Sequence, residues 1–147
     1  MTPNTVTNFY SHDHDELDAY FKNFQDTKMQ DAKKAKEYFG KFKHGLERHI
    51  EWEESILFPL FEEKTGMKDQ GPTAVMRHEH TQIKQYLQAI HENILKDDFN
   101  TYQEEDSLLE TLQAHNQKEE GILYPAIDRI ASEEEQNLIF IQMNLKN

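Results

Sequence analysis

Apolar residues recur at steps of three and four along most of the chain, which is the spacing of an amphipathic α-helix. The first such stripe contains Tyr10, Leu17, Phe21 and Phe24. Only five Gly and four Pro occur among many Glu, Lys, Gln and Leu, a composition that favours helix throughout. The pattern predicts helices over residues of about 11–24, 31–63, 72–95, 100–130 and 133–145, and the last begins at a capping box, Ser132 to Glu135.

The segments between these helices are short, and residues 64–71 are expected to form the hinge between the two halves of the chain. Four main helices joined in this way predict an all-α fold, an antiparallel up-down four-helix bundle, with a short fifth helix at the C-terminus. We expect one domain over residues 1–147. Pro59 and Pro125 should kink the second and fourth helices or interrupt their regular hydrogen bonding.

The chain repeats itself at an interval of 66 residues. The segment from His49 to Pro59 has its copy from His115 to Pro125, and the copy retains both Glu residues, an Ile-Leu pair and the Pro. The segment from His12 to Leu17 matches the segment from His78 to Ile83 at the same interval. Two similar units in tandem indicate a bundle whose halves are related by a pseudo-twofold axis.

Each of the four main helices carries one histidine on its apolar face: His14, His49, His80 and His115. His14 shares its face with Tyr10 and Leu17, whereas His12 lies about 200° around the helix, among acidic residues. His78 likewise falls on the polar face of its helix. We therefore expect His12 and His78 on the surface, although either could serve as an additional ligand.

A glutamate follows two of these histidines by one helical turn, at Glu53 and Glu119. Residues i and i+4 lie about 40° apart, so each His–Glu pair reaches the same point in the core. The next residues, Glu54 and Glu120, are expected to point about 140° away, into solvent.

A buried carboxylate is costly unless it is paired with a cation or binds a metal. No Lys or Arg shares the inward faces near Glu53 and Glu119, and the chain has no Cys. The predicted site is therefore a pair of metal ions held by nitrogen and oxygen donors. His14 and His49 would bind one ion, His80 and His115 the other, and the two glutamates would bridge them. Imidazole and carboxylate suit Fe, Zn, Mn or Cu.

With this pattern of ligands, residues 10–131 resemble the hemerythrin family, in its HHE (hemerythrin-like, cation-binding) branch. The family pattern of His, His-x-x-x-Glu, His and a final His with an acidic residue falls here on His14, His49, Glu53, His80, His115 and Glu119. The resemblance implies a four-helix bundle around a non-haem di-iron centre, two Fe ions (Fe²⁺/Fe³⁺) with an oxo or hydroxo bridge. It also implies a small ligand: O₂, NO or peroxide.

Two departures from the oxygen-carrying hemerythrins concern the ligands. Those proteins have a second histidine on the third helix, where this chain has Met76 and Lys84 four residues either side of His80. They also place an Asp five residues after the last His, so Glu120 remains an alternative to Glu119. One fewer imidazole leaves more exchangeable positions, which favours redox turnover or sensing over protected oxygen transport.

These considerations predict oxygen binding, sensing or storage. The alternatives are a di-iron redox enzyme (peroxidase-like, NO-detoxifying or Fe(II)-oxidising) and an iron sensor, so catalysis is left open. A net charge of −12 argues against nucleic acid and anionic membranes as partners. The mean hydropathy of −0.93 argues against a membrane span. No signal peptide is visible, and a cytoplasmic protein is the default expectation. A homodimer is compatible with the sequence.

Overall fold

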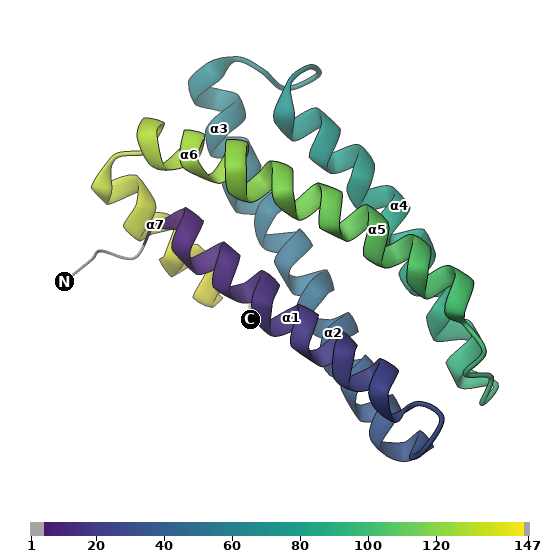
Figure 1. Ribbon diagram of the computed structural model, residues 1–147. Coiled ribbons are helices and arrows are strands. Elements are labelled where there is room, and N and C mark those ends of the chain that lie inside the picture. Colours follow the sequence, from purple (N-terminus) through teal and green to yellow (C-terminus); the bar gives the residue numbers. More distant parts are fainter. Residues whose placement is uncertain (1–4, 146–147) are drawn as a thin grey trace.

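The amphipathic segments form a bundle of antiparallel helical rods in a computed structural model that describes residues 5–145 (Figure 1). The elements are α1 (Val6–Thr27), α2 (Ala32–Trp52), η1 (Glu53–Leu57), α3 (Phe58–Thr65), α4 (Pro72–Leu95), α5 (Tyr102–Lys118), η2 (Glu119–Leu123), α6 (Tyr124–Ile130) and α7 (Glu133–Leu145). Elements α2, η1 and α3 make one continuous rod, and α5, η2 and α6 make another. The predicted all-α bundle is confirmed.

Helix boundaries follow local capping chemistry. Helix α1 begins at Val6, earlier than the predicted residue 11, because the Thr5 side chain accepts a hydrogen bond from the backbone N–H of Asn8 at 3.0 Å. It also continues past residue 24 to Thr27. The capping box before α7 is confirmed: Ser132 N–H donates to Glu135 Oε1 at 2.8 Å, and Glu135 N–H donates to Ser132 Oγ at 3.1 Å.

Both internal prolines follow a π-helical turn. In η1 the N–H of Phe58 donates to the carbonyl of Glu53, and in η2 the N–H of Tyr124 donates to the carbonyl of Glu119. This five-residue spacing lets the helix pass the proline, which lacks an N–H and crowds the preceding turn. The rods therefore continue to Thr65 and Ile130, and the predicted interruption of regular hydrogen bonding is a widened turn at the glutamates.

Two apolar clusters form the core, and a polar layer separates them along the rods. One cluster includes Tyr10, Leu57 and Met76, and the other includes Leu17 and Ile83. His14 lies between Tyr10 and Leu17 in sequence, and His80 lies between Met76 and Ile83, so the histidines are placed at the junction of the clusters. The apolar face that the sequence predicts thus surrounds the polar residues on both sides.

Gly45 owes its place to close helix packing. A Cβ there would lie 2.6 Å from Leu17 Cδ2 on α1. Helical spacing places Val75 and Ile122 on the apolar faces of their helices, but both side chains are exposed, at 46% and 62%. Ile122 lies in η2, where the wider turn departs from the α-helical spacing on which the expectation rested.

A buried ion pair joins α1 to α5 at the end of the bundle away from α7. Lys28 Nζ donates to Glu105 Oε2 at 2.6 Å, and both side chains are almost fully buried. The hydroxyl of Thr101 and the amide of Gln25 also donate to Glu105, at 2.5 and 3.0 Å. Because breaking a buried pair leaves an uncompensated charge, this cluster fixes α1 and α5 relative to each other.

Candidate metal centre

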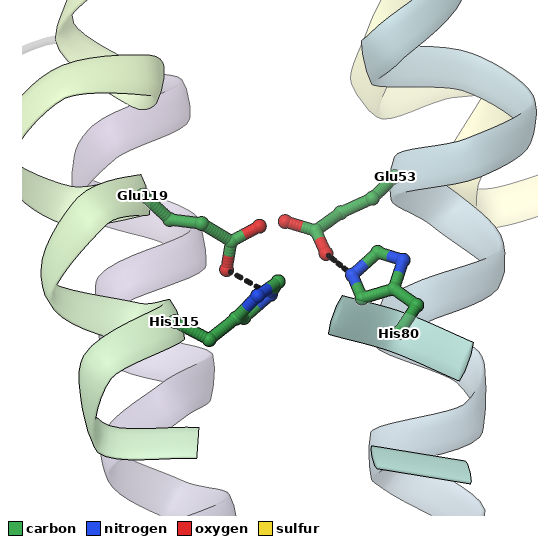
Figure 2. A group of neighbouring side chains, drawn as sticks. All are labelled: Glu53, His80, His115 and Glu119. Atoms are coloured by element: carbon green, nitrogen blue, oxygen red, sulfur yellow. Dashed lines mark hydrogen bonds and ion pairs between the residues drawn. The ribbon is translucent and has the colours of Figure 1, made fainter. Parts of the chain in front are cut away.

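Six predicted ligands meet in the polar layer between the apolar clusters. They are His14 on α1, His49 on α2, Glu53 in η1, His80 on α4, His115 on α5 and Glu119 in η2. The imidazoles are 1–4% exposed and the two glutamates are fully buried. We call Glu53 and Glu119 the inner glutamates. Figure 2 shows both inner glutamates facing each other beside His80 and His115.

Each imidazole directs its Nε2 atom at an inner glutamate. Nε2 of His80 lies 3.0 Å from Glu53, and Nε2 of His49 lies 3.6 Å from it. Nε2 of His14 and Nε2 of His115 both lie 3.2 Å from Glu119. Four nitrogen lone-pair positions and two carboxylates therefore converge on one volume.

The ligand atoms form two overlapping groups, within each of which all the atoms lie within 4.8 Å of one another. One group contains Glu53, His80, His115 and Glu119, and the other contains His14, His49 and Glu119. Glu119 belongs to both. The imidazoles are paired as the internal repeat predicts, and their binding of two ions stays a prediction.

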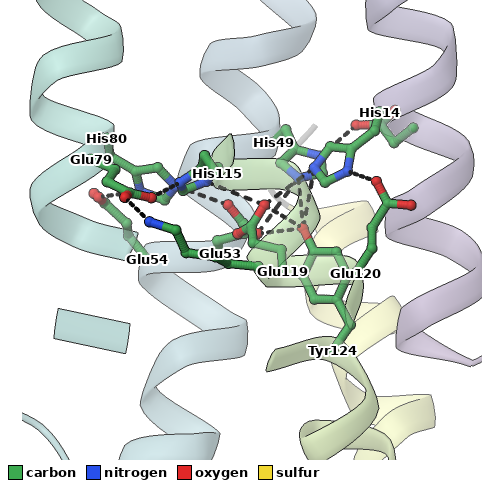
Figure 3. A network of polar contacts seen from close by, with 12 residues as sticks. His14, His49, Glu53, Glu54, Glu79, His80, His115, Glu119, Glu120 and Tyr124 are labelled. Carbon is green, nitrogen blue, oxygen red and sulfur yellow. Dashed lines mark hydrogen bonds and ion pairs between the residues drawn. The ribbon is translucent and has the colours of Figure 1, made fainter. Parts of the chain in front are cut away.

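The opposite nitrogen of every imidazole faces a further carboxylate, and Figure 3 labels three of these carboxylates, Glu54, Glu79 and Glu120. Nδ1 of His49 lies 2.7 Å from Asp13, and Nδ1 of His115 lies 2.9 Å from Glu79. Nδ1 of His80 lies 2.8 Å from Glu54, and Nδ1 of His14 lies 2.9 Å from Glu120. We call these four the outer carboxylates. Since an ionised carboxylate only accepts hydrogen bonds, each Nδ1 carries a hydrogen, and loss of the second hydrogen from Nε2 makes that atom available to bind a cation.

Two of the outer carboxylates correct an expectation. Glu54 and Glu120 are only partly in solvent, with side chains 27% and 39% exposed, because each also contacts an imidazole on a neighbouring helix. The other two, Asp13 and Glu79, had no role in the sequence prediction. A signal for them existed: they are the middle residues of His12–His14 and His78–His80 and keep the 66-residue interval. His12 and His78 are exposed, as expected, and His12 lies 3.1 Å from Glu16 on the same helix.

Tyr124 is the central residue that the sequence did not identify. Its buried hydroxyl lies 2.6 Å from Glu53 Oε2 and 2.9 Å from Glu119 Oε1. It also lies 3.1 Å from Nε2 of His49 and 3.4 Å from Nε2 of His14. The hydroxyl is within hydrogen-bond distance of both inner glutamates. Its single hydrogen can be donated to only one of them at a time.

The family model described as hemerythrin HHE cation binding domain matches residues 5–127, which include all six predicted ligands. The chain belongs to the hemerythrin family.

Two known proteins are similar in sequence to this chain. An uncharacterized hemerythrin-like protein of Schizosaccharomyces pombe is 29% identical over 123 residues, which is 84% of this chain and 59% of that protein. The iron-sulfur cluster repair protein YtfE of Edwardsiella ictaluri is 44% identical over 45 residues, 31% of this chain and 20% of that protein. This chain thus spans at most about three-fifths of the length of these relatives. No solved structure gave a significant match.

Protons balance the charges of the hemerythrin centre when metal is absent. Burial alone would lower the pKa of His49, but Glu53 and Asp13 outweigh burial and raise this pKa to about 10. Burial likewise opposes the charge of His80, and hydrogen bonds to Glu53 and Glu54 raise its pKa to about 9. Burial opposes the charge of Glu53 too, yet His49 holds the pKa of Glu53 well below its usual range. These imidazolium protons stand where cations would bind.

The donor set fits a metal of the kind that hemerythrin-like domains bind. Among the described residues, Glu119 Oε2 is a buried oxygen with no hydrogen-bond partner. Such an atom is costly in a protein interior and is typical of a ligand position. Imidazole nitrogen with carboxylate oxygen, and without thiolate, is a common donor set for iron. In the described part of the chain, no helix combines the length and apolar character needed to cross a bilayer.

Proposed function

We propose that this hemerythrin-family protein is a non-haem di-iron protein that binds O₂ or a related small ligand, NO or peroxide, at a carboxylate-bridged site, for oxygen binding, sensing or storage. His14 and His49 would hold one iron, His80 and His115 the other, and Glu53 and Glu119 would bridge them. The convergence of four Nε2 atoms on two fully buried glutamates carries the proposal.

Iron bound there, with an oxo or hydroxo bridge, would supply open coordination positions and reversible one-electron chemistry. The protein orients every imidazole through its outer carboxylate, which sets the tautomer and raises the basicity of Nε2. It also excludes bulk water, because apolar clusters close the layer on both sides.

The size of the site limits the ligand. The six predicted ligands border a small cavity. The centre of a water-sized molecule could occupy a volume of about 10 Å³ within it. That is close to the smallest space that holds one water. A diatomic molecule or a peroxide suits such a space, whereas an organic substrate would require the helices to separate.

The test begins with elemental analysis and an optical spectrum of protein purified under mild conditions. We expect about two irons per chain, in line with two ligand groups, and a charge-transfer band in the oxidised protein. Adding O₂ or NO to the reduced protein should give a new band that disappears when the gas is removed. A chain without bound iron, or a centre that is oxidised irreversibly at first contact, would contradict the proposal.

A second candidate is a di-iron redox enzyme, and the ligand set favours it over a protected carrier. Met76 and Lys84 stand where a further imidazole would lie on α4, so the iron held by His80 and His115 would have more exchangeable positions. The similarity of 45 residues to a protein named for iron-sulfur cluster repair is compatible with redox chemistry. Steady-state consumption of peroxide or NO with an electron donor would establish catalysis, and a reaction that stops after one equivalent would exclude it.

A further inference from the structure

A surface groove of about 880 Å³ lies between α1 and α5. Its walls include Asp18 and Lys22 from α1 and Gln113 and Gln117 from α5. The groove lies between two points where α1 is joined to the rod of α5: the Glu105 cluster at one end, and the contact of His14 with Glu120 at the other. These two contacts hold α1 and α5 together at both ends of the groove, so the two helices can lie further apart between them.

The groove leads toward the centre through two small spaces. Asp18, Leu112 and Asn116 line both the groove and an inner cavity of about 10 Å³ beside His14. His14, Leu46, Leu112 and Asn116 line both that cavity and the cavity at the metal ligands. Leu112 and Asn116 therefore border all three spaces, and small movements of these two side chains would join them.

The internal repeat provides a comparison for this route on the opposite side of the bundle. There, Ile50 on α2 occupies the position of Asn116, is 2% exposed and belongs to the apolar cluster. Lys84 and Ser55 occupy the positions of Asp18 and Gly121, two residues that line the groove. A surface hollow on α4 is lined by Lys84 and its neighbours on that helix, and it shares no residue with the cavity at the ligands. The side between α2 and α4 is closed where the side between α1 and α5 is not.

We infer that small uncharged ligands reach the centre through the groove between α1 and α5 and not between α2 and α4, and that Asn116 and Leu112 control the rate. The identity of these ligands, O₂ and NO, rests on the proposed function; the route rests on the cavities. Asn116 has an exposed neighbour, Gln117, and a predicted ligand, His115, beside it in sequence, so it lies between solvent and the centre.

The first experiment varies the size of residue 116 in iron-loaded protein and measures NO association by stopped flow. Asn116→Phe should slow association about tenfold, which corresponds to about 1.4 kcal/mol in the barrier. Dissociation should slow equally, so the Kd should stay within about twofold, since both directions use one route. The association rate of Asn116→Ala, the matched control, should equal or exceed that of the unmodified protein. Lys84→Ala, in the hollow on the closed side, should leave the rate unchanged. Equal rates for Asn116→Phe and Asn116→Ala would overturn the inference.

The second experiment needs no iron. Dissolved O₂ is paramagnetic and enhances the relaxation of nearby methyl groups in the metal-free protein. We expect larger enhancement at Leu112, which lines all three spaces, than at Leu87, which is buried on α4 and lines none of them. Equal enhancement, or more at Leu87, would refute this route. A loaded protein that binds no NO would refute the proposed function alone, since the relaxation measurement would still decide the route.

Discussion

The two halves of the bundle have the same coordination chemistry and different surroundings. His14, His49 and Glu53 in the first half correspond to His80, His115 and Glu119 in the second, and the outer carboxylates also correspond: Asp13 to Glu79, and Glu54 to Glu120. Each His–carboxylate contact in one half has its counterpart in the other. The symmetric part of the molecule is thus the part that would hold two cations.

The asymmetry at the centre comes from one oxygen atom. Phe58 stacks on His80 with 5.7 Å between ring centroids, and its counterpart Tyr124 lies 5.8 Å from His14. The two centroid distances are similar, but only Tyr124 adds a hydroxyl, which contacts both inner glutamates. The difference between Phe58 and Tyr124 therefore changes a position that only packs into one that also forms hydrogen bonds.

Helix α7 produces a second difference, because it lies outside the repeat. It packs against η1, and Ile56 there is 7% exposed, whereas its counterpart Ile122 in η2 is 62% exposed. Figure 1 shows α7 beside the N-terminal end of α1, on one side of the bundle. The two halves therefore have the same predicted ligands, but α7 packs on the π-turn of the first half and leaves Ile122 in the second half exposed.

Removal of a matched ligand should have the largest effect on the comparison. His49→Ala and His115→Ala each take an imidazole from a different predicted ion, so each should lower the iron content from about two per chain to one or fewer. Iron analysis and circular dichroism on both variants provide the measurement. If either variant keeps two irons with an unchanged spectrum, the symmetric assignment is wrong.

The pH dependence of stability should be the next largest effect. The pKa of His49 rises from 6.5 to about 10 on folding, and that of His80 to about 9. A histidine whose pKa is raised by folding stabilises the folded state. This contribution to stability is fully present below pH 6.5 and is lost as the pH rises through 9 and 10. The lowered pKa of Glu53 acts in the other direction, stabilising above pH 4.5.

Metal-free protein should therefore be most stable between pH 4.5 and 6.5 and weaken toward pH 10. Bound metal requires neutral imidazoles, so the rise in Tm caused by iron should grow as the pH increases. Thermal unfolding with and without iron across this range tests both signs. A metal-free Tm that rises steadily to pH 10 would contradict the charge balance described for the centre.

The outer carboxylates should have smaller, equal effects in the two halves. Asp13→Asn and Glu79→Gln each weaken the acceptor for one Nδ1 hydrogen, and such changes commonly reduce metal affinity by about 10- to 100-fold. Competition with a chelator measures the affinities. Glu16→Gln, an exposed neutralisation on α1, is the control for net charge. Clearly unequal losses of metal affinity would show that the outer carboxylates of the two halves do not have equivalent roles.

Exchange of Tyr124 for the residue of the other half tests the asymmetry directly. Tyr124→Phe removes the hydroxyl from two buried glutamates and should cost about 1–3 kcal/mol of unfolding free energy in the metal-free protein. Iron content should be retained, because the six predicted ligands remain. Urea unfolding measures the cost, and a loss no greater than that of Tyr102→Phe, an exposed control, would argue against a role for the hydroxyl.

The smallest effect concerns two glycines whose counterparts, Asp106 and Thr111, carry side chains. A Cβ on Gly40 would contact nothing within 4 Å, so Gly40→Ala should stabilise α2 by up to about 1 kcal/mol. Gly45→Ala should gain less or destabilise, because its Cβ would lie 2.6 Å from Leu17. Equal gains in Tm would show that Leu17 moves aside at no cost.

The regular part of the fold was accessible from the sequence because periodicity reports burial. Tyr10, Leu17, Phe21 and Phe24 are all buried, as their spacing predicts. The repeat also indicated which imidazole of each pair points inward, since His12 and His14 lie on different faces. Cooperative features were missed: Lys28 and Glu105 form a buried pair although they are 77 residues apart and neither lies in a recognisable motif.

At the site, the prediction for Glu54 and Glu120 was incomplete. Helical spacing indicates that these side chains leave the apolar face, but it does not show that each meets an imidazole of a neighbouring helix. The prolines indicated an irregularity without specifying its kind. Asp13 and Glu79 could have been found by asking which acidic residues, besides the inner glutamates, keep the repeat interval. The hydroxyl of Tyr124 could not, since Phe and Tyr are equivalent in an apolar stripe.

The π-turns also determine how the chain tolerates a change in length. Each turn holds one residue more than α-helical pitch requires. Deleting Ser55 would therefore convert the bond between Phe58 and Glu53 into an ordinary α-helical one and leave Phe58 near His80. Deleting a residue from an α-helical part of the same rod would instead rotate every side chain beyond it by about 100°. These two turns are thus the places where a rod can lose one residue without losing its register.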